Sequence, residues 1–167
     1  MLVLITGGSG SGKSEFAENL AVSMSKNLTY IAAMRPSDDA ECQNRIARHR
    51  KMRADKGFNT VERYTDIKNL DISGTAVLEC ISNLLANEMF GGSGKNAVSE
   101  ILLGVENIKK QCDNLIIVTN EISSDGMEYD TMTQEYKKNL GFINCEIAKT
   151  ADEVYEVVCG TVNKLKG

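Results

Sequence analysis

The chain has 167 residues, of which 42% are hydrophobic and 25% charged, and these values predict a single globular domain, residues 1–167, with a substantial core. Its formal net charge of −4 argues against a general nucleic-acid-binding protein and against a protein that binds an acidic membrane surface. No run of apolar residues is long enough to span a membrane, so we expect a cytoplasmic protein.

Short apolar runs alternate with helical patterns through the first half of the chain. The expected elements are, in order, a strand at 2–5, a helix at 13–26, a strand at 28–32, a helix at 39–54, a loop with one short helical turn at 66–74, a strand at 75–78 and a helix at 81–90. The first strand and helix are separated by a glycine-rich segment. This order is typical of βαβ units.

The second half continues the alternation. A second glycine-rich segment, Gly91–Lys95, follows a helix instead of a strand and predicts a flexible connection. The remaining expected elements are a helix at 97–111, a strand at 115–118, a polar loop at 121–130, a helix at 131–149 and strands at 153–159 and 161–165. The sequence therefore predicts an α/β fold, a mainly parallel sheet with helices on both faces and ligands at the carboxyl ends of the strands.

The segment GGSGSGKS between the first strand and helix matches the phosphate-binding pattern G-x-x-x-x-G-K-[ST] in its required setting. Glycines allow the backbone to bring its N–H groups close to an anion, and the start of the helix adds positive charge. We expect a nucleoside triphosphate here, with Lys13 on the outer phosphates and Ser14 as a ligand of Mg²⁺. The expected nucleotide-binding residues of this P-loop are Gly7, Gly8, Ser9, Gly10, Ser11, Gly12, Lys13 and Ser14.

Five cysteines are scattered singly along the chain, without a C-x-x-C pair. An odd, widely spaced set of this kind indicates reduced thiols and argues against a disulfide framework or a zinc site. We expect most of these cysteines to fill the core.

The only histidine, His49, lies in the basic segment RIARHRKMR. On a helix, Arg45, His49 and Arg53 would share one face. A solvated basic face with an incidental histidine is one interpretation. The other is that the arginines hold a polyphosphate while a neutral imidazole, favoured by the neighbouring cations, attacks phosphorus and forms a covalent intermediate.

Three glutamates are further candidates, although surface carboxylates are common. Glu79 directly follows the strand at 75–78, where a P-loop protein often places an acidic residue near Mg²⁺. Glu121 follows the strand at 115–118, and Glu62 would stand near the basic helix, where it could accept hydrogen bonds from a sugar or a base.

Several motifs in order along almost the whole chain resemble one family. They are GGSGSGKSEFAE, YIAA, RI-x-x-HR-x-x-R followed by F-x-T-x-E, VLEC with SNLL, VTNE and ADEVYEVVCG. Together they resemble adenosylcobinamide kinase/adenosylcobinamide-phosphate guanylyltransferase. RI-x-x-HR combined with VTNE is much more specific than the P-loop, which many proteins share.

The resemblance implies two reactions of cobalamin biosynthesis. A nucleoside triphosphate, GTP or ATP, would phosphorylate adenosylcobinamide, and GTP would then donate GMP to that phosphate through a guanylylated histidine, with release of pyrophosphate. His49 matches that histidine, and the fold implied is a P-loop domain related to the RecA type, assembled as a trimer. By the same match, further contacts with GTP would come from Ala33, Met34, Arg35, Arg50, Lys51, Met52, Arg53, Glu62 and Glu79.

The chain also departs from the family pattern. Gly10 replaces an arginine of the P-loop, Phe58 replaces a tryptophan, and Cys145 replaces a glutamine. After VTNE the chain reads ISSDGMEYD, without the proline that the family expects. These differences bear on the acceptor and on phosphorylation more than on nucleotide binding. Two alternatives are a divergent P-loop transferase with another acceptor and a GTP-binding regulator that transfers no group.

Overall fold

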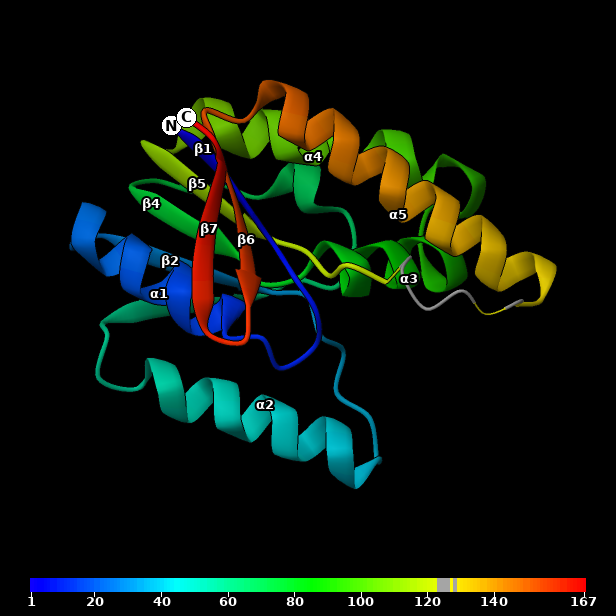
Figure 1. Ribbon diagram of the computed structural model, residues 1–167, viewed down its shortest axis with the longest axis horizontal. Coiled ribbons are helices and arrows are strands. Elements are labelled where there is room, and N and C mark those ends of the chain that lie inside the picture. Colours follow the sequence, from blue (N-terminus) through cyan, green and yellow to red (C-terminus); the bar gives the residue numbers. More distant parts are fainter. Residues whose placement is uncertain (123–126, 128) are drawn as a thin grey trace.

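The computed structural model contains a seven-stranded sheet with the strand order β3-β2-β4-β5-β1-β6-β7 (Figure 1). It describes residues 1–122, 127 and 129–167, and within these ranges it leaves the side chains of Cys42 and Arg45 undescribed. The strands are β1 (Leu2–Thr6), β2 (Leu28–Ala32), β3 (Phe58–Glu62), β4 (Thr75–Leu78), β5 (Asn114–Val118), β6 (Glu153–Val158) and β7 (Thr161–Lys166). Every neighbouring pair is parallel except β6 and β7, which are antiparallel.

Helices cover both faces of this sheet, as the sequence predicted. The helices are α1 (Lys13–Met24), α2 (Ala40–Arg53), α3 (Ile81–Gly91), α4 (Ala97–Gln111) and α5 (Thr131–Thr150), with short 3₁₀ turns η1 (Ile67–Asn69) and η2 (Gly94–Asn96). One core lies between α1 and the sheet, and a larger one lies between the sheet and α3, α4 and α5. In the described part of the chain, no helix has both the length and the apolar character needed to cross a membrane.

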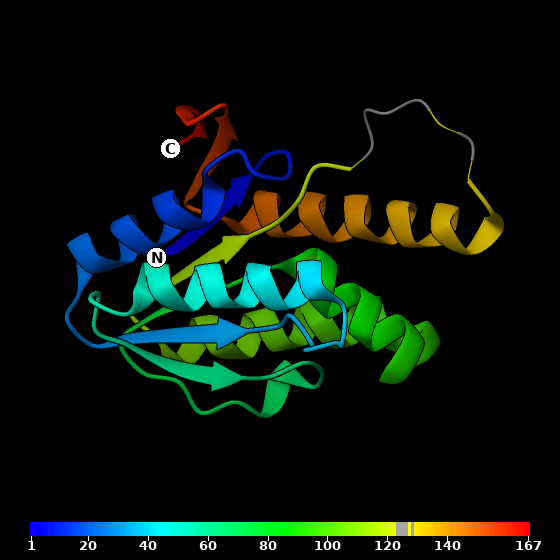
Figure 2. The ribbon, with the colours of Figure 1, turned by 90° about the horizontal axis from the view of Figure 1, so that it is seen from below.

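The α2 helix lies outside these two cores. Figures 1 and 2 show it beside β2 and β3, joined to the sheet by the connections at its two ends. Three of its side chains meet the sheet: the guanidinium carbon of Arg53 lies 3.7 Å from the centre of the Tyr30 ring on β2, Arg50 pairs with Glu62 at the end of β3, and His49 lies near Glu79 after β4. The basic helix therefore reaches the carboxyl edge of the sheet, where parallel strands place their ligands.

Some expectations from the sequence were wrong. The β3 strand was not predicted, because its residues FNTVE lack an apolar run and form a partly exposed edge. The segment Gly91–Lys95 does connect two helices, but its first residue ends α3 and its last two belong to the η2 turn. Of the four cysteines with described side chains, Cys80 is buried, whereas Cys145 and Cys159 are exposed and do not fill the core.

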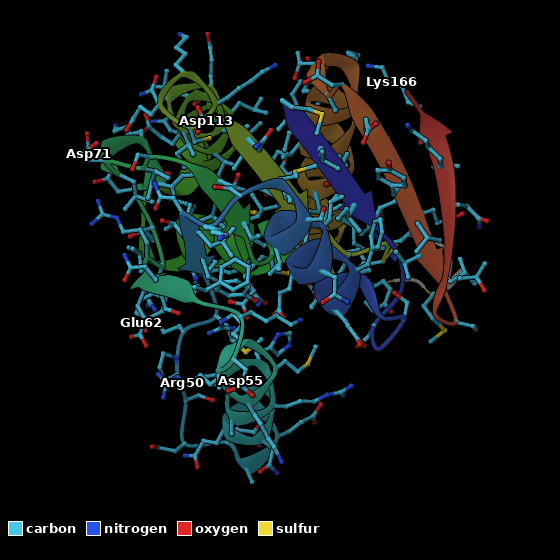
Figure 3. The ribbon with its side chains drawn as sticks, turned by 90° about the vertical axis from the view of Figure 1, so that its left-hand side faces the viewer. Arg50, Asp55, Glu62, Asp71, Asp113 and Lys166 are labelled. Carbon is cyan, nitrogen blue, oxygen red and sulfur yellow. The ribbon has the colours of Figure 1, made fainter. Side chains whose placement is uncertain are left out.

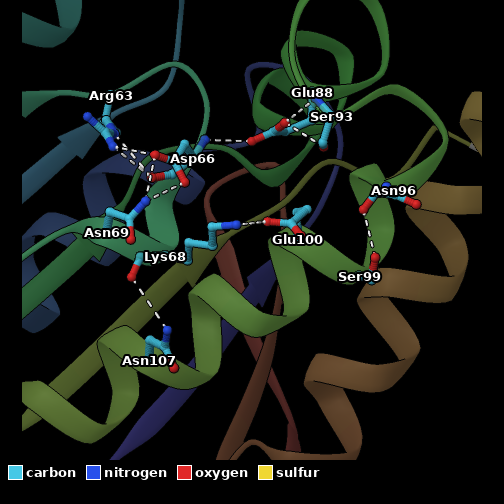
Figure 4. A network of polar contacts seen from close by, with 10 residues as sticks. All are labelled: Arg63, Asp66, Lys68, Asn69, Glu88, Ser93, Asn96, Ser99, Glu100 and Asn107. Atoms are coloured by element: carbon cyan, nitrogen blue, oxygen red, sulfur yellow. Dashed lines mark hydrogen bonds and ion pairs between the residues drawn. The ribbon is translucent and has the colours of Figure 1, made fainter.

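A buried carboxylate holds the segment after β3 against the end of α3 (Figure 4). Glu88 is 3% exposed and accepts hydrogen bonds from the Asp66 backbone N–H at 2.6 Å and from the Ser93 N–H and hydroxyl at 2.9 and 2.7 Å. Arg63 in turn donates to the backbone oxygen of Asp66. Since Asp66 has a left-handed φ of 54°, these bonds fix a conformation that non-glycine residues rarely adopt.

We predict that Glu88→Gln lowers the free energy of unfolding at neutral pH by about 1–3 kcal/mol, because an amide replaces a buried acceptor of charge-assisted hydrogen bonds. Urea denaturation measures the change. Glu106→Gln is the control: it removes a pair with Lys110 between exposed side chains and should change stability by less than about 0.5 kcal/mol.

Acid should abolish the difference between Glu88→Gln and the wild type. Burial raises the pKa of Glu88, but the hydrogen bonds from Asp66 and Ser93 lower it more, so the pKa lies below its usual value. The stabilisation is thus fully present above the ordinary glutamate pKa and is lost as the pH falls through the lowered one. A difference in stability that persists unchanged at lower pH would contradict this account.

Candidate functional site

A cavity of about 400 Å³ lies at the carboxyl edge of the sheet. Because β1, β4 and β5 run parallel, the residues that follow them meet there: Ser9–Ser14 after β1, Glu79 after β4 and Asn120 after β5. From the other side α2 contributes His49. The P-loop and the only histidine of the chain therefore line the same cavity.

The P-loop is shaped by glycines with positive φ. Gly12 caps the start of α1 with φ 100°, and Gly7 has φ 149° directly beneath β6. A Cβ at Gly7 would overlap the carbonyl oxygen of Val157, so only glycine fits there. Lys13 is 6% exposed and donates to the Gly8 carbonyl oxygen at 2.6 Å, which holds its ammonium group within the loop.

His49 faces a buried carboxylate. Its Nδ1 lies 3.9 Å from Oε1 of Glu79, and the two side chains are 17% and 6% exposed. The other oxygen of Glu79, Oε2, accepts hydrogen bonds from the backbone N–H groups of Ala33 at 3.1 Å and Met34 at 3.3 Å. The carboxylate is thus fixed by the sheet with one oxygen directed toward the imidazole.

The charges around Glu79 partly balance one another. Burial raises the pKa of Glu79, while hydrogen bonds from Met34 and Ala33 and the positive charge of Arg53 offset part of this effect. Burial, followed by the charge of Glu79, raises the pKa of Tyr30, which keeps its hydroxyl neutral. Arg53 is itself 7% exposed, and among the described residues its Nε and Nη1 have no hydrogen-bond partner.

A smaller hollow of about 20 Å³ lies between α2 and the strands β2 and β3. At its rim Arg50 of α2 donates to Oε1 of Glu62 at 2.8 Å (Figure 3). The Tyr64 hydroxyl donates to the other oxygen, Oε2, at 2.8 Å. The hydrogen bond from Tyr64 and then that from Arg50 lower the pKa of Glu62. The hollow opens toward Arg53, His49 and Glu79, so it adjoins the main cavity.

The structure brings most of the predicted site residues to these two hollows. The main cavity is lined by Ser9, Gly10, Ser11, Gly12, Lys13, Ser14, Met34, His49, Met52 and Glu79, and the smaller one adds Arg50, Arg53 and Glu62. Ala33 is buried behind Glu79. Lys51 is exposed and, among the described residues, lies outside the walls of both hollows. The side chain of Arg45 lies outside the described residues.

Some lining residues were missed. Glu41, Asn44 and Arg48 on α2 line the main cavity, as do Asn83 in the first turn of α3 and Asn120 after β5. The α2 residues follow one another at spacings of three and four, together with Met52, and so form one face of the helix. Extending that spacing from His49 and Met52 toward the start of the helix would have found them.

Comparison with known proteins agrees with this geometry. Residues 3–165 match the family model described as cobinamide kinase / cobinamide phosphate guanyltransferase. The chain is 30% identical to the bifunctional adenosylcobalamin biosynthesis protein CobU of Escherichia coli, with 99% of this chain and 100% of that protein covered. It is 29% identical to the protein of the same name from Salmonella typhimurium, over the same shares of the two chains.

Among solved structures, the fold is similar to that of an ATPase from the type III secretion system of pathogenic bacteria. The TM-score is 0.54 at 11% identity, and the match covers 93% of this chain and 50% of that one. At this identity the likeness shows the fold alone, that of a P-loop NTPase.

We predict that Gly7→Ala lowers the free energy of unfolding by more than about 2 kcal/mol, because its Cβ meets the Val157 carbonyl oxygen in a backbone conformation that strains alanine. Gly8→Ala is the matched control: no atom lies within 4 Å of a Cβ there, and we expect a loss below about 1 kcal/mol. Urea denaturation of both variants tests the difference, and equal losses would show that β6 does not constrain the loop.

Proposed function

The chain belongs to the cobinamide kinase / cobinamide phosphate guanyltransferase family, and we propose that it phosphorylates adenosylcobinamide and then transfers GMP from GTP to the product through His49. One observation carries this proposal: the P-loop lysine and the only histidine line the same cavity. A triphosphate held by the loop is therefore within the same space as a nucleophile that can attack it.

The transfer of GMP takes two displacements. A ring nitrogen of His49 attacks the α-phosphorus of GTP; a P–N bond forms, the bond to the bridging oxygen breaks, and pyrophosphate leaves. An oxygen of adenosylcobinamide phosphate then attacks the same phosphorus, the P–N bond breaks, and the imidazole is restored. The phosphoramidate divides one difficult displacement into two easier ones.

Glu79 has two features that suit this chemistry. It faces Nδ1 of His49, and it is held in place by two backbone N–H groups. A carboxylate in that position orients the ring and stabilises the positive charge that the imidazole acquires when its other nitrogen bonds to phosphorus. We therefore assign Glu79 as the residue that positions the nucleophile.

Lys13 and the arginines of α2 would neutralise the phosphates. The Lys13 ammonium group, which donates a hydrogen bond to the Gly8 carbonyl oxygen, would lie near the outer phosphates. Arg48 lines the same cavity from α2. The exposed Lys51 lies farther out on the same basic helix. The buried guanidinium of Arg53, with two N–H groups that have no described partner, and the Arg50–Glu62 pair would meet the nucleoside.

Mg²⁺ fits the oxygen donors present. The Ser14 hydroxyl and the Glu79 carboxylate line the main cavity, and one or two such protein ligands together with phosphate oxygens are the usual environment of this ion. Held there, Mg²⁺ would supply charge neutralisation on the phosphates. In the described residues, no cluster of three or more His, Cys, Asp or Glu side chains forms a separate metal site.

Phosphorylation of the acceptor needs less from the protein. Positioning of the hydroxyl against the γ-phosphate and neutralisation of charge dominate such transfers, and GTP or ATP could be the donor. The Gly10 position, which carries no side chain and has φ 71°, leaves the loop without the family's arginine, so Lys13 would act with the arginines of α2. Assembly as a trimer rests on the family resemblance alone, and a cytoplasmic location stays an expectation from the sequence.

We predict that His49→Ala abolishes labelling of the protein by GTP that carries ³²P at the α-position. The wild type should form an adduct that is labile in acid and stable in alkali, as a phosphoramidate is. The variant should still phosphorylate adenosylcobinamide, which serves as the control for folding. Label retained by the variant would place the nucleophile elsewhere.

We further predict that Glu79→Gln slows formation of the adduct by roughly 10²-fold while GTP binding measured without Mg²⁺ changes by less than about threefold, because the amide keeps the shape but not the charge beside the imidazole. Rapid-quench labelling measures the rate, and equilibrium titration measures binding. A parallel loss of rate and affinity would assign Glu79 to nucleotide binding instead.

A further inference from the structure

A further hollow, distinct from the small one beside β2 and β3, adjoins the main cavity. This groove has a volume of about 380 Å³ and lies between the segment after β2 and the outer face of α3. Three residues line both spaces: Met34, Glu41 and Asn83. The groove and the main cavity are therefore continuous, with Asn83 at the junction.

Helix α3 forms one wall of the groove with residues from a single face. Asn83, Ala86 and Asn87 follow one another at helical spacing and line the groove. The same face continues to Phe90, which is 59% exposed although it is a large aromatic residue. The opposite face of α3 is packed in the core through Leu84 and Leu85. The outer face of α3 thus offers carboxamides, a small residue and an aromatic ring to solvent.

Two contacts join α3 to the segment after β2 along this groove. Asn87 donates from Nδ2 to the Ala33 carbonyl oxygen at 2.8 Å, which joins α3 to the segment after β2. Arg35 lies against the far end of α3, where a Cβ on Gly91 would be 3.4 Å from its Nη1. Arg35, which we expect to contact the nucleotide, also lines this groove.

The main cavity is too small for both substrates of the proposed reactions. Its volume of about 400 Å³ lies near the lower end of the range for pockets that hold one small ligand. A corrin ring is larger than a nucleotide and carries primary amides around an apolar face. The side-chain amides of Asn83 and Asn87 can donate hydrogen bonds to such amides and accept hydrogen bonds from them. An exposed aromatic ring can pack against an apolar face.

We infer that the groove between residues 34–41 and α3 binds the amide-bearing corrin ring of the acceptor, while its aminopropanol arm passes Asn83 into the main cavity. This inference rests on the proposed function. The arm delivers its hydroxyl, and later its phosphate, to the space between the P-loop and His49. The ring stays outside in both reactions, so one groove serves both.

Two variants of the groove test this inference. Ala86→Trp fills the groove, and Phe90→Ala removes the exposed ring that follows Ala86 and Asn87 along α3. Each should raise the KM for adenosylcobinamide phosphate about tenfold or more in GMP transfer. Labelling of His49 by GTP in the absence of acceptor should stay within twofold of the wild type, since the groove takes no part in that step. Ala86→Leu, a smaller addition, should give an intermediate KM if the tryptophan variant folds poorly.

Matched controls and a truncated acceptor separate the outcomes. Ala54→Trp adds the same bulk at an exposed site, and Phe142→Ala removes a ring that is 52% exposed on α5; both should leave the KM unchanged. Aminopropanol phosphate, which lacks the ring, should be used equally by the wild type and Ala86→Trp. If the groove variants are labelled by GTP and their KM for adenosylcobinamide phosphate is unchanged, the groove does not bind the corrin ring, and only this inference is wrong. A wild type that takes no label would overturn the proposed function, and this inference with it.

Discussion

The structure depends on one buried carboxylate at the carboxyl edge of the sheet. Glu79 ends β4, accepts two backbone hydrogen bonds from the segment after β2, and faces the imidazole of α2. A buried charge is tolerated only when it is paired and hydrogen-bonded. The backbone N–H groups, Arg53 and the Tyr30 hydroxyl meet that requirement. The same contacts therefore stabilise the carboxylate and determine where α2, and with it His49, lies against the sheet.

The sequence predicted what depends on local patterns. The apolar runs of β1, β2, β4 and β5 are continuous because parallel strands are buried on both faces, and the P-loop follows from a fixed spacing of glycines. The β3 strand was missed because an edge strand needs no apolar run; its pairing with β2 decides its conformation. The packing of Arg53 on the Tyr30 ring could not be predicted from local patterns either, because the two residues are far apart in the chain.

The orientation of α2 shows this limit most clearly. Helical spacing correctly put His49 and Arg53 on related faces, but it could not tell which way either face points. In the structure Arg53 turns to the sheet, Arg50 turns to Glu62, and Arg48 turns to the main cavity. The arginines of this one basic segment therefore lie in three separate environments. The choice among them is made by the acidic and aromatic groups of the sheet, which lie elsewhere in the sequence.

In the proposed mechanism, the position of the P-loop between two neighbours allows one cavity to serve two transfers. The Gly160 N–H of the β6–β7 turn donates to the Ser11 carbonyl oxygen, and the Glu121 N–H after β5 donates to that of Gly7, so the loop is held from both sides. A fixed loop would give the triphosphate one position, with the γ-phosphorus open to one nucleophile and the α-phosphorus to another. The reaction that follows is then decided by which nucleophile approaches, a hydroxyl from the acceptor or the imidazole from α2. Two chemistries thus require one binding mode for the phosphates and two directions of attack.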